Sequence, residues 1–317
     1  MPDARPLIRP PIRLLLVAAM AVVGSCAKPA ERSPLHAAQP ATSTSTIPRP
    51  STTTVPMDLF SLRPPPPADD PILLAQQIEV AENTLRDPAS TDDAAARAAL
   101  AQQVAYRQLG VHPEWDDTVK ANLPAHLQRA ADLNMIARRE FRAMHTRLPT
   151  VMPAWRIVEP APAPALLDSY REAAATFGVA WEYLAAINLV ETGFGRIRGT
   201  STAGAQGPMQ FMPATWDAYG NGGDINDVHD AIMGAGRYLA ANNGATDIGH
   251  ALFRYNHSEH YVRGVQLYAE LIREHPQAFL AYYRWGIWYL TERGEVYLPV
   301  GYEEVAPVPV EEYLARR

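Results

Sequence analysis

The stretch ETGFGRIRGTSTAGAQGPMQFMPATW, residues 191–216, decides how this chain folds, because it surrounds one carboxyl group with glycine-rich and proline-opened segments. Upstream, apolar residues recur at helical spacing from Trp181 to Asn188, which predicts a buried helix that Gly193 ends. Glu191 then falls in the last helical turn. There the negative end of the helix dipole and apolar neighbours favour the protonated carboxyl group, which is the form that a general acid needs.

Three sequence blocks carry a family pattern, in the order Glu191-Thr192, residues 204–216 and Tyr255-Asn256. Together they resemble the catalytic domain of soluble-type lytic transglycosylases, whose pattern is Glu-Ser, then Gly-Leu-Met-Gln-x-Met-Pro, then Tyr-Asn-Ala-Gly. The chain departs from this pattern at Thr192, Pro208 and His257-Ser258. The resemblance spans about residues 165–275. It implies an all-α, lysozyme-like fold that cleaves the glycan strands of peptidoglycan.

The resemblance also implies the chemistry. Glu191 would protonate the glycosidic oxygen between N-acetylmuramic acid (MurNAc) and N-acetylglucosamine (GlcNAc), with assistance from the muramyl acetamido group. It would then take the proton of the muramyl C6 hydroxyl group, which closes onto C1 to give a 1,6-anhydro end. Ordinary glycosidases use two carboxyl groups, and residues 191–216 offer no second acid at a comparable position.

The expected substrate-binding residues are Gln210, Tyr255, Ser201, Met212 and Asn256. Gln210 can donate and accept hydrogen bonds to a sugar at once. In the related enzymes the tyrosine that matches Tyr255 hydrogen-bonds the catalytic glutamate, although its helical spacing also fits a core residue. Ser201 offers a hydroxyl group, Met212 fits a sugar-facing wall or the core equally well, and Asn256 can hold its loop in place.

Two other functions remain open. If Asp217, Asp224 or Asp227 supplies a second carboxylate, the chain is a hydrolase similar to goose-type lysozymes; Asp227 also fits a helix cap. The other alternative is a non-catalytic wall-binding lipoprotein. No cofactor is expected, and no metal either, because His257, Glu259 and His260 match no familiar ligand spacing.

The N-terminus has the pattern of a lipoprotein signal peptide. Arg5, Arg9 and Arg13 precede the apolar run 14–23, which is shorter than the roughly 20 residues needed to span a bilayer. Residues 23–26 then match a bacterial lipobox, and Cys26 is the only cysteine in the chain. We therefore expect residues 1–25 to be removed and the chain to be exported and lipid-anchored through Cys26, at a membrane surface of the cell envelope that faces the wall.

Composition limits the partners. The formal net charge is −6, which argues against nucleic acid as a ligand. Acidity gives no help in binding an anionic wall polymer, so we expect recognition through local contacts with sugars. We also expect a monomer. With one cysteine no disulfide supports the fold.

Composition shifts divide the chain into further regions. Residues 26–68 are rich in Pro, Ser and Thr, which predicts a disordered tether. Residues 69–150 show helical stripes, with Asp92 as one expected cap. We expect them to form a helical platform that packs against the catalytic domain; the alternative is that they provide an extra contact with glycan or protein. Prolines at 149–164 mark a boundary, so the catalytic domain is placed at 151–275.

The remaining residues, 276–317, form an aromatic-rich C-terminal extension that is expected to be a small hairpin or helix. Its aromatic run consists of Tyr282, Tyr283, Trp285, Trp288 and Tyr289. These side chains fit a packed cover of the domain, and they also fit stacking on sugars.

Overall fold

A computed structural model describes residues 58–317. The expected signal peptide, Cys26 and the tether before residue 58 lie outside the described residues. Within them the chain forms twelve α-helices and a few short strands, so the predicted all-α class is confirmed. None of the helices in 58–317 combines the length and the apolar character needed to cross a membrane.

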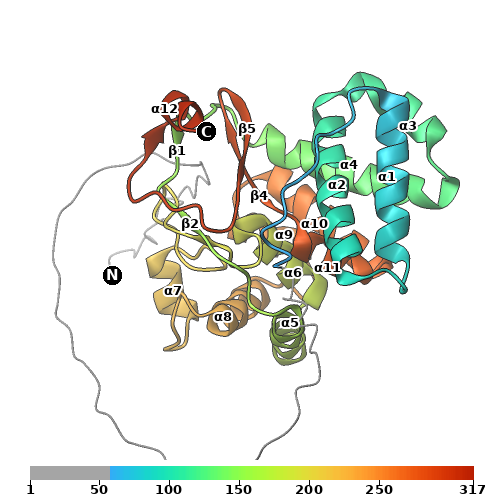
Figure 1. Ribbon diagram of the computed structural model, residues 1–317. Coiled ribbons are helices and arrows are strands. Elements are labelled where there is room, and N and C mark those ends of the chain that lie inside the picture. The colour runs from blue at the N-terminus through green and yellow to red at the C-terminus, as the bar shows by residue number, and fades with distance from the viewer. Residues whose placement is uncertain (1–57) are drawn as a thin grey trace, which may run out of the picture.

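The first four helices form a layer on one side of the molecule (Figure 1). They are α1 (Pro71–Arg86), α2 (Asp92–Val111), α3 (Asp116–Asn122) and α4 (Ala125–Ala143), with a 3₁₀ turn at Pro113–Trp115. Asp70 caps α1 by accepting from two backbone N–H groups. Helix α2 is capped by Thr91, whose side chain accepts from Ala94 N–H; the expected cap, Asp92, is instead the first helical residue.

The next helices surround the stretch around Glu191. They are α5 (Ala163–Phe177), α6 (Trp181–Thr192), α7 (Pro213–Tyr219), α8 (Val228–Ala241) and α9 (Ile248–Tyr255). Gly178 and Gly193 end α5 and α6 in the left-handed conformation, with φ of 72° and 58°, which glycine adopts without steric cost. Asp227 caps α8 through a bond from Asp230 N–H, as its spacing predicts.

Helix α10 (Glu259–Glu274) joins the two groups of helices, because it packs against both α4 and α6. Its apolar face belongs to one continuous core that extends from α1 to α11 (Gln277–Arg284). Gly264 permits the close approach to α4: a Cβ atom there would lie 2.5 Å from Cζ of Phe141. The close packing of α4 against α10 therefore depends on residue 264 being a glycine, which has no side chain.

The C-terminal residues form a second, smaller core with residues that precede α5. Strands β4 (Ile287–Thr291) and β5 (Gly294–Leu298) make a hairpin, and α12 (Val310–Ala315) follows β6 (Val308–Pro309). Strand β1 (Val151–Met152) pairs with β6, and β2 (Arg156–Ile157) pairs with β3 (Ile197–Arg198). Residues 151–157, expected in the catalytic domain, thus share a core with the C-terminal extension.

Residues 58–68 differ from the expected tether, since they lie along the folded body. The ring of Phe60 packs edge-on against Tyr283, with centroids 5.6 Å apart. Tyr297 Oη donates to the Leu62 carbonyl at 3.2 Å, and Ala68 N–H donates to Gln77 Oε1 at 2.9 Å. Apolar burial and hydrogen bonds offset the cost of ordering these residues.

The close approach at Gly264 predicts that Gly264→Ala destabilises the fold. Helix propensity favours alanine by about 1 kcal/mol, but overpacking against the Phe141 ring costs about 2–3 kcal/mol at so close a contact, so we expect a net loss of roughly 1–2 kcal/mol. Urea denaturation followed by circular dichroism measures it. Phe141→Leu in the same chain should recover part of the loss.

Gly249→Ala is the matched control, because its added Cβ would meet no atom closer than 3.6 Å and should leave stability unchanged or raise it. Equal behaviour of the two alanine variants would contradict the role given to Gly264.

Candidate active site

Glu191 lies in a cavity of about 300 Å³ between the helices and the C-terminal hairpin. Its side chain is carried by the last turn of α6 and is 8% exposed. Apolar residues line the cavity around it: Leu189, Val190, Ile287 and Leu290. These side chains contribute to the burial of the carboxyl group.

The carboxyl group of Glu191 is protonated at neutral pH. Burial raises its pKa to about 8, and the hydrogen bond from Tyr261 opposes that rise. Tyr261 Oη lies 2.7 Å from Glu191 Oε1, whereas Glu191 Oε2 has no hydrogen-bond partner among the described residues. We place the acid's proton on Oε2, because Oε1 accepts the tyrosine hydroxyl proton.

A buried polar network fixes α6 to the loop that faces it. The carbonyl oxygen of Pro208 accepts from Thr192 Oγ1 at 2.5 Å and from Asn188 Nδ2 at 2.8 Å. Thr192 Oγ1 also accepts from Gly195 N–H at 2.9 Å, and Tyr170 Oη donates to Asn188 Oδ1 at 2.6 Å. Thr192, a departure from the family pattern, thus performs a structural role that any hydroxyl side chain can perform.

Two of the expected substrate-binding residues, Gln210 and Ser201, line the same cavity as Glu191. Gln210 has a positive φ of 50°, and its Nε2 donates to the Gly207 carbonyl at 3.0 Å, which fixes the orientation of its amide group. Ser201 Oγ accepts from Ala205 N–H at 2.9 Å, so its hydroxyl proton remains available to a ligand.

Tyr255 does not make the hydrogen bond to Glu191 that the family resemblance implies. Its hydroxyl group donates to the Met209 carbonyl at 2.7 Å, and Tyr261 takes the place beside the acid. The two rings lie parallel, with centroids 6.4 Å apart and an interplanar angle of 5°. Helical spacing places Tyr255 correctly on a buried face, but it gives no information on which hydroxyl group crosses to α6.

Met212 and Asn256 are not among the residues that line the cavity. Met212 immediately precedes α7. Asn256 follows α9 and is buried, and its Nδ2 has no hydrogen-bond partner among the described residues. The three aspartates considered as a second carboxylate, Asp217, Asp224 and Asp227, do not line the cavity either; among residues 58–317, Glu191 is the one acidic residue in the wall of this cavity.

The hairpin also forms part of the cavity wall. Trp288, Tyr289 and Leu290 line it. Gln103 on α2 secures the hairpin: it donates to the Gly286 carbonyl at 2.9 Å and accepts from Gly286 N–H at 2.9 Å and from Trp288 Nε1 at 3.1 Å. Residues of the aromatic run therefore pack within the fold and also line the site.

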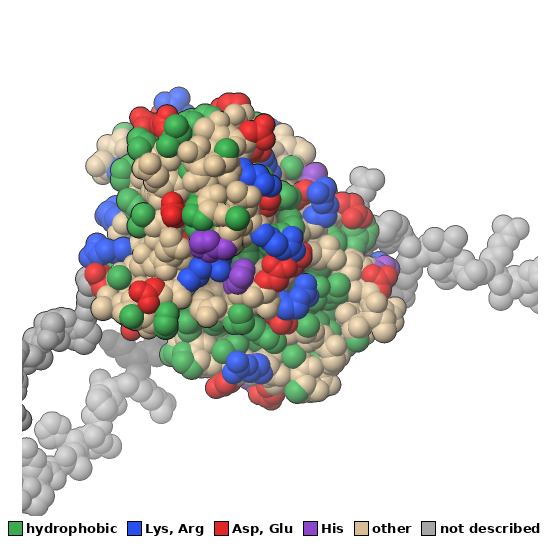
Figure 2. Space-filling model, turned by 90° about the vertical axis from the view of Figure 1, so that its right-hand side faces the viewer, with side chains coloured by type: hydrophobic (Ala, Val, Ile, Leu, Met, Phe, Trp, Pro, Cys, Tyr) green, Lys and Arg blue, Asp and Glu red, His purple; other side chains and the backbone are tan. Residues whose placement is uncertain are grey.

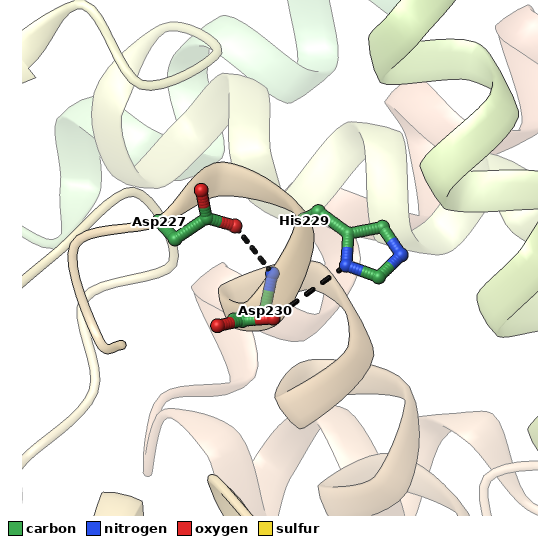
Figure 3. Close-up of side chains that lie close together, drawn as sticks. All are labelled: Asp227, His229 and Asp230. Carbon is green, nitrogen blue, oxygen red and sulfur yellow. Dashed lines mark hydrogen bonds and ion pairs between the residues drawn. The ribbon is translucent and has the colours of Figure 1, made fainter. Parts of the chain in front are cut away.

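Asp227, His229 and Asp230 form a group whose ligand atoms lie within 4.8 Å of one another (Figure 3). Their contacts are those of a helix start: Asp227 accepts from Asp230 N–H, and Asp230 Oδ2 accepts from Asp224 N–H. The pKa of His229 is raised, chiefly by its hydrogen bond to Glu172, which favours a cationic ring. These contacts explain the group without a metal ion.

Comparison with known families gives one finding: residues 168–270 match the family model described as "Transglycosylase SLT domain". The match contains Glu191, Gln210, Tyr255 and Tyr261, and it supports a peptidoglycan-degrading transglycosylase of the lytic transglycosylase family. No curated protein and no solved structure matches the chain. The hairpin and α4, which also line the cavity, lie outside the matched residues.

The pKa of Glu191 predicts that Glu191→Gln stabilises the protein, and more so at high pH. Between the ordinary pKa of 4.5 and about 8 the folded state holds a proton that the unfolded state lacks, so stability falls as pH rises through this window. The glutamine of the variant does not titrate, so the stability of the variant does not fall in this way. We expect its advantage in unfolding free energy to grow by about 4 kcal/mol from pH 5 to pH 8.5.

Chemical denaturation of both proteins at several pH values measures this difference. An advantage that stays constant or shrinks with rising pH would show that the folded protein does not hold the proton.

Proposed function

We propose that this chain is a lytic transglycosylase that cleaves the β-1,4 bond between MurNAc and GlcNAc and leaves a 1,6-anhydroMurNAc end. One observation carries the proposal: in the part of the chain that the structure describes, the cavity wall contains a single acidic residue, Glu191, and its burial raises its pKa to about 8. A lone acid that keeps its proton can begin the cleavage, but it leaves the nucleophile to the substrate.

The proposed reaction has two steps. Glu191 donates its proton to the glycosidic oxygen, the bond from that oxygen to the muramyl C1 breaks, and the muramyl acetamido oxygen attacks C1. The ionised Glu191 then removes the C6 hydroxyl proton, O6 bonds to C1, and the acetamido oxygen leaves. The acid is regenerated and no water is consumed. Tyr261 assists the first step, because its hydrogen bond stabilises the carboxylate that forms when Glu191 gives up its proton.

Gln210 and Ser201 are the best supported substrate contacts, since both line the cavity that contains Glu191. For Tyr255, Met212 and Asn256 we propose support of the loops that surround the cavity. The buried Tyr255 hydroxyl group holds the Met209 carbonyl, and Met209 precedes Gln210. Loss of this bond would act on the substrate through the loop.

We also propose that the chain acts as a monomer at the cell envelope, held to a membrane through a lipid on Cys26. Residues 23–26 have the lipobox pattern, and peptidoglycan is the substrate that the matched domain implies. Replacing Cys26 with Ser should release the chain from the membrane fraction without altering the purified enzyme's kinetics.

Digestion of purified peptidoglycan by residues 58–317 should release muropeptides that are lighter by one water than the hydrolysis products of the same bond. Mass spectrometry of the released fragments checks this, and Glu191→Gln should lower the rate by at least about a thousandfold, since it removes both proton transfers. Reducing ends in place of anhydro ends would assign the chain to the hydrolases. Unchanged wall binding with no fragments from the wild-type protein would assign it to the non-catalytic binders.

The rate should fall as pH rises above about 8, where Glu191 loses its proton. Tyr261→Phe removes a hydrogen bond that stabilises the carboxylate, so the pKa of Glu191 rises and the alkaline limb of the pH–rate profile moves to higher pH. We expect kcat to fall about tenfold at the optimum, because one hydrogen bond to an ionised group is worth roughly 1.5 kcal/mol.

Tyr255→Phe is the control, since its hydroxyl group bonds to a backbone carbonyl and not to the acid. It should leave the position of the alkaline limb unchanged. A shift with Tyr255→Phe and none with Tyr261→Phe would reverse the two assignments.

A further inference from the structure

The cavity has a basic wall on the side formed by α2 and α4, outside the residues that match the family model. Helix α4 and the residues after it contribute Arg138, Phe141, Arg142 and His145, which recur at the spacing of one helix face. Helix α2 contributes Arg107 next to Tyr106. We call the three side chains Arg107, Arg138 and Arg142 the basic wall.

The basic wall has more positive charge than its own carboxylate can balance. Its partner is Glu295 on β5: Arg107 Nε lies 2.7 Å from Glu295 Oε2, Arg138 also contacts Glu295, and Arg142 Nη1 lies 3.6 Å away. Burial alone would raise the pKa of Glu295, but Arg138 and Arg107 outweigh it and lower the pKa. One carboxylate therefore faces three guanidinium groups.

No other charge in the cavity restores the balance. Burial lowers the pKa of Arg107 to about 9, which leaves it cationic at neutral pH, and the further cation Arg196 lines the same cavity. Among the described residues that line the cavity, Glu191 is the one acid, and its raised pKa keeps it neutral at pH 7. The chain as a whole carries −6, and the face shown in Figure 2 mixes acidic and basic side chains. The concentration of positive charge in the cavity is thus local.

Unbalanced buried cations are costly unless an anion joins them. Arg142 is the side chain placed to receive one: it is 38% exposed, and among the described residues its one ion pair is the long contact with Glu295. A guanidinium group with free donors binds a carboxylate through two parallel hydrogen bonds.

The basic wall is close to the acid. Tyr261, which donates to Glu191, lies edge-on to Phe141 with ring centroids 6.5 Å apart. Arg138 and Arg142 flank Phe141 on α4, within one helical turn of it. Glu191 and the basic wall line one cavity of about 300 Å³, so a substituent of a ligand bound at the acid can extend through this cavity to the basic wall.

We propose that the basic wall binds the free carboxylates of the peptide stem that MurNAc carries, an inference that rests on the proposed function. The muramyl ring holds both the C1 atom that reacts and, on its O3 lactyl ether, the first residue of the stem. The sugars of the strand are otherwise uncharged, so the stem is the part of this substrate that supplies anions. Helices α2 and α4 then select peptide-bearing strands.

The test compares two substrates: glycan strands that carry their peptides and strands from which an amidase has removed them. The readout is the ratio of kcat/KM for the first to that for the second. Arg142→Gln should lower this ratio about three- to tenfold, mainly through KM, as expected for loss of one charge-assisted contact. Arg142→Lys should retain part of it. Arg129→Gln removes a cation from α4 that does not line the cavity and should leave the ratio unchanged.

A binding measurement separates this inference from the activity. The Glu191→Gln variant is titrated calorimetrically with a soluble muramyl peptide that has free carboxylates, with the same peptide after amidation of those carboxylates, and with inorganic phosphate. We expect preference for the free carboxylates, weaker binding in high salt, and loss of the preference in Glu191→Gln/Arg142→Gln.

Equal binding of both peptides would overturn the inference, as would binding of phosphate that depends on Arg142 without any preference between the peptides. If neither strand is cleaved, the proposed function fails, and the titration still decides what the basic wall binds.

Discussion

The carbonyl oxygen of Pro208 accepts two buried hydrogen bonds, from Asn188 and Thr192, and the site depends on this junction. A buried carbonyl group without a partner would cost roughly 1–3 kcal/mol, so helix α6 and the glycine-rich loop hold each other in one arrangement. Gly207 allows the loop to pass closely, since a Cβ atom there would lie 1.9 Å from the Ile225 carbonyl oxygen. Gln210 and Glu191 consequently line a single cavity.

The same packing that fixes the site also disfavours the charge of its acid. Helix α10 places Tyr261 next to Glu191, and Gly264 allows α4 to pack closely against α10. The hairpin lines the same cavity. Each of these elements removes water from the carboxyl group and so raises its pKa, and the single hydrogen bond from Tyr261 compensates only in part. Glu191 retains its proton because burial of its carboxyl group disfavours the charged form.

Sequence reasoning succeeds here where the signal is local. The last turn of α6, its end at Gly193 and the Asp227 cap each follow from a few adjacent residues. It fails where contacts depend on distant elements: Tyr255 and Tyr261 both lie on buried helix faces, and only the packing of α10 decides between them. Pairing of β1 with β6 is likewise non-local. The order of the residues after 58 could have been predicted from Leu59, Phe60 and Leu62, because these apolar side chains interrupt a Pro-rich tract.

Phe60 lies near Arg196, with the guanidinium carbon 5.8 Å from the ring centroid. Arg196 in turn donates from Nε to the Gly193 carbonyl at 2.8 Å, directly after the helix that carries Glu191. The ordered residues that begin at 58 are therefore connected, through Phe60 and Arg196, to the glycine that ends the helix carrying Glu191.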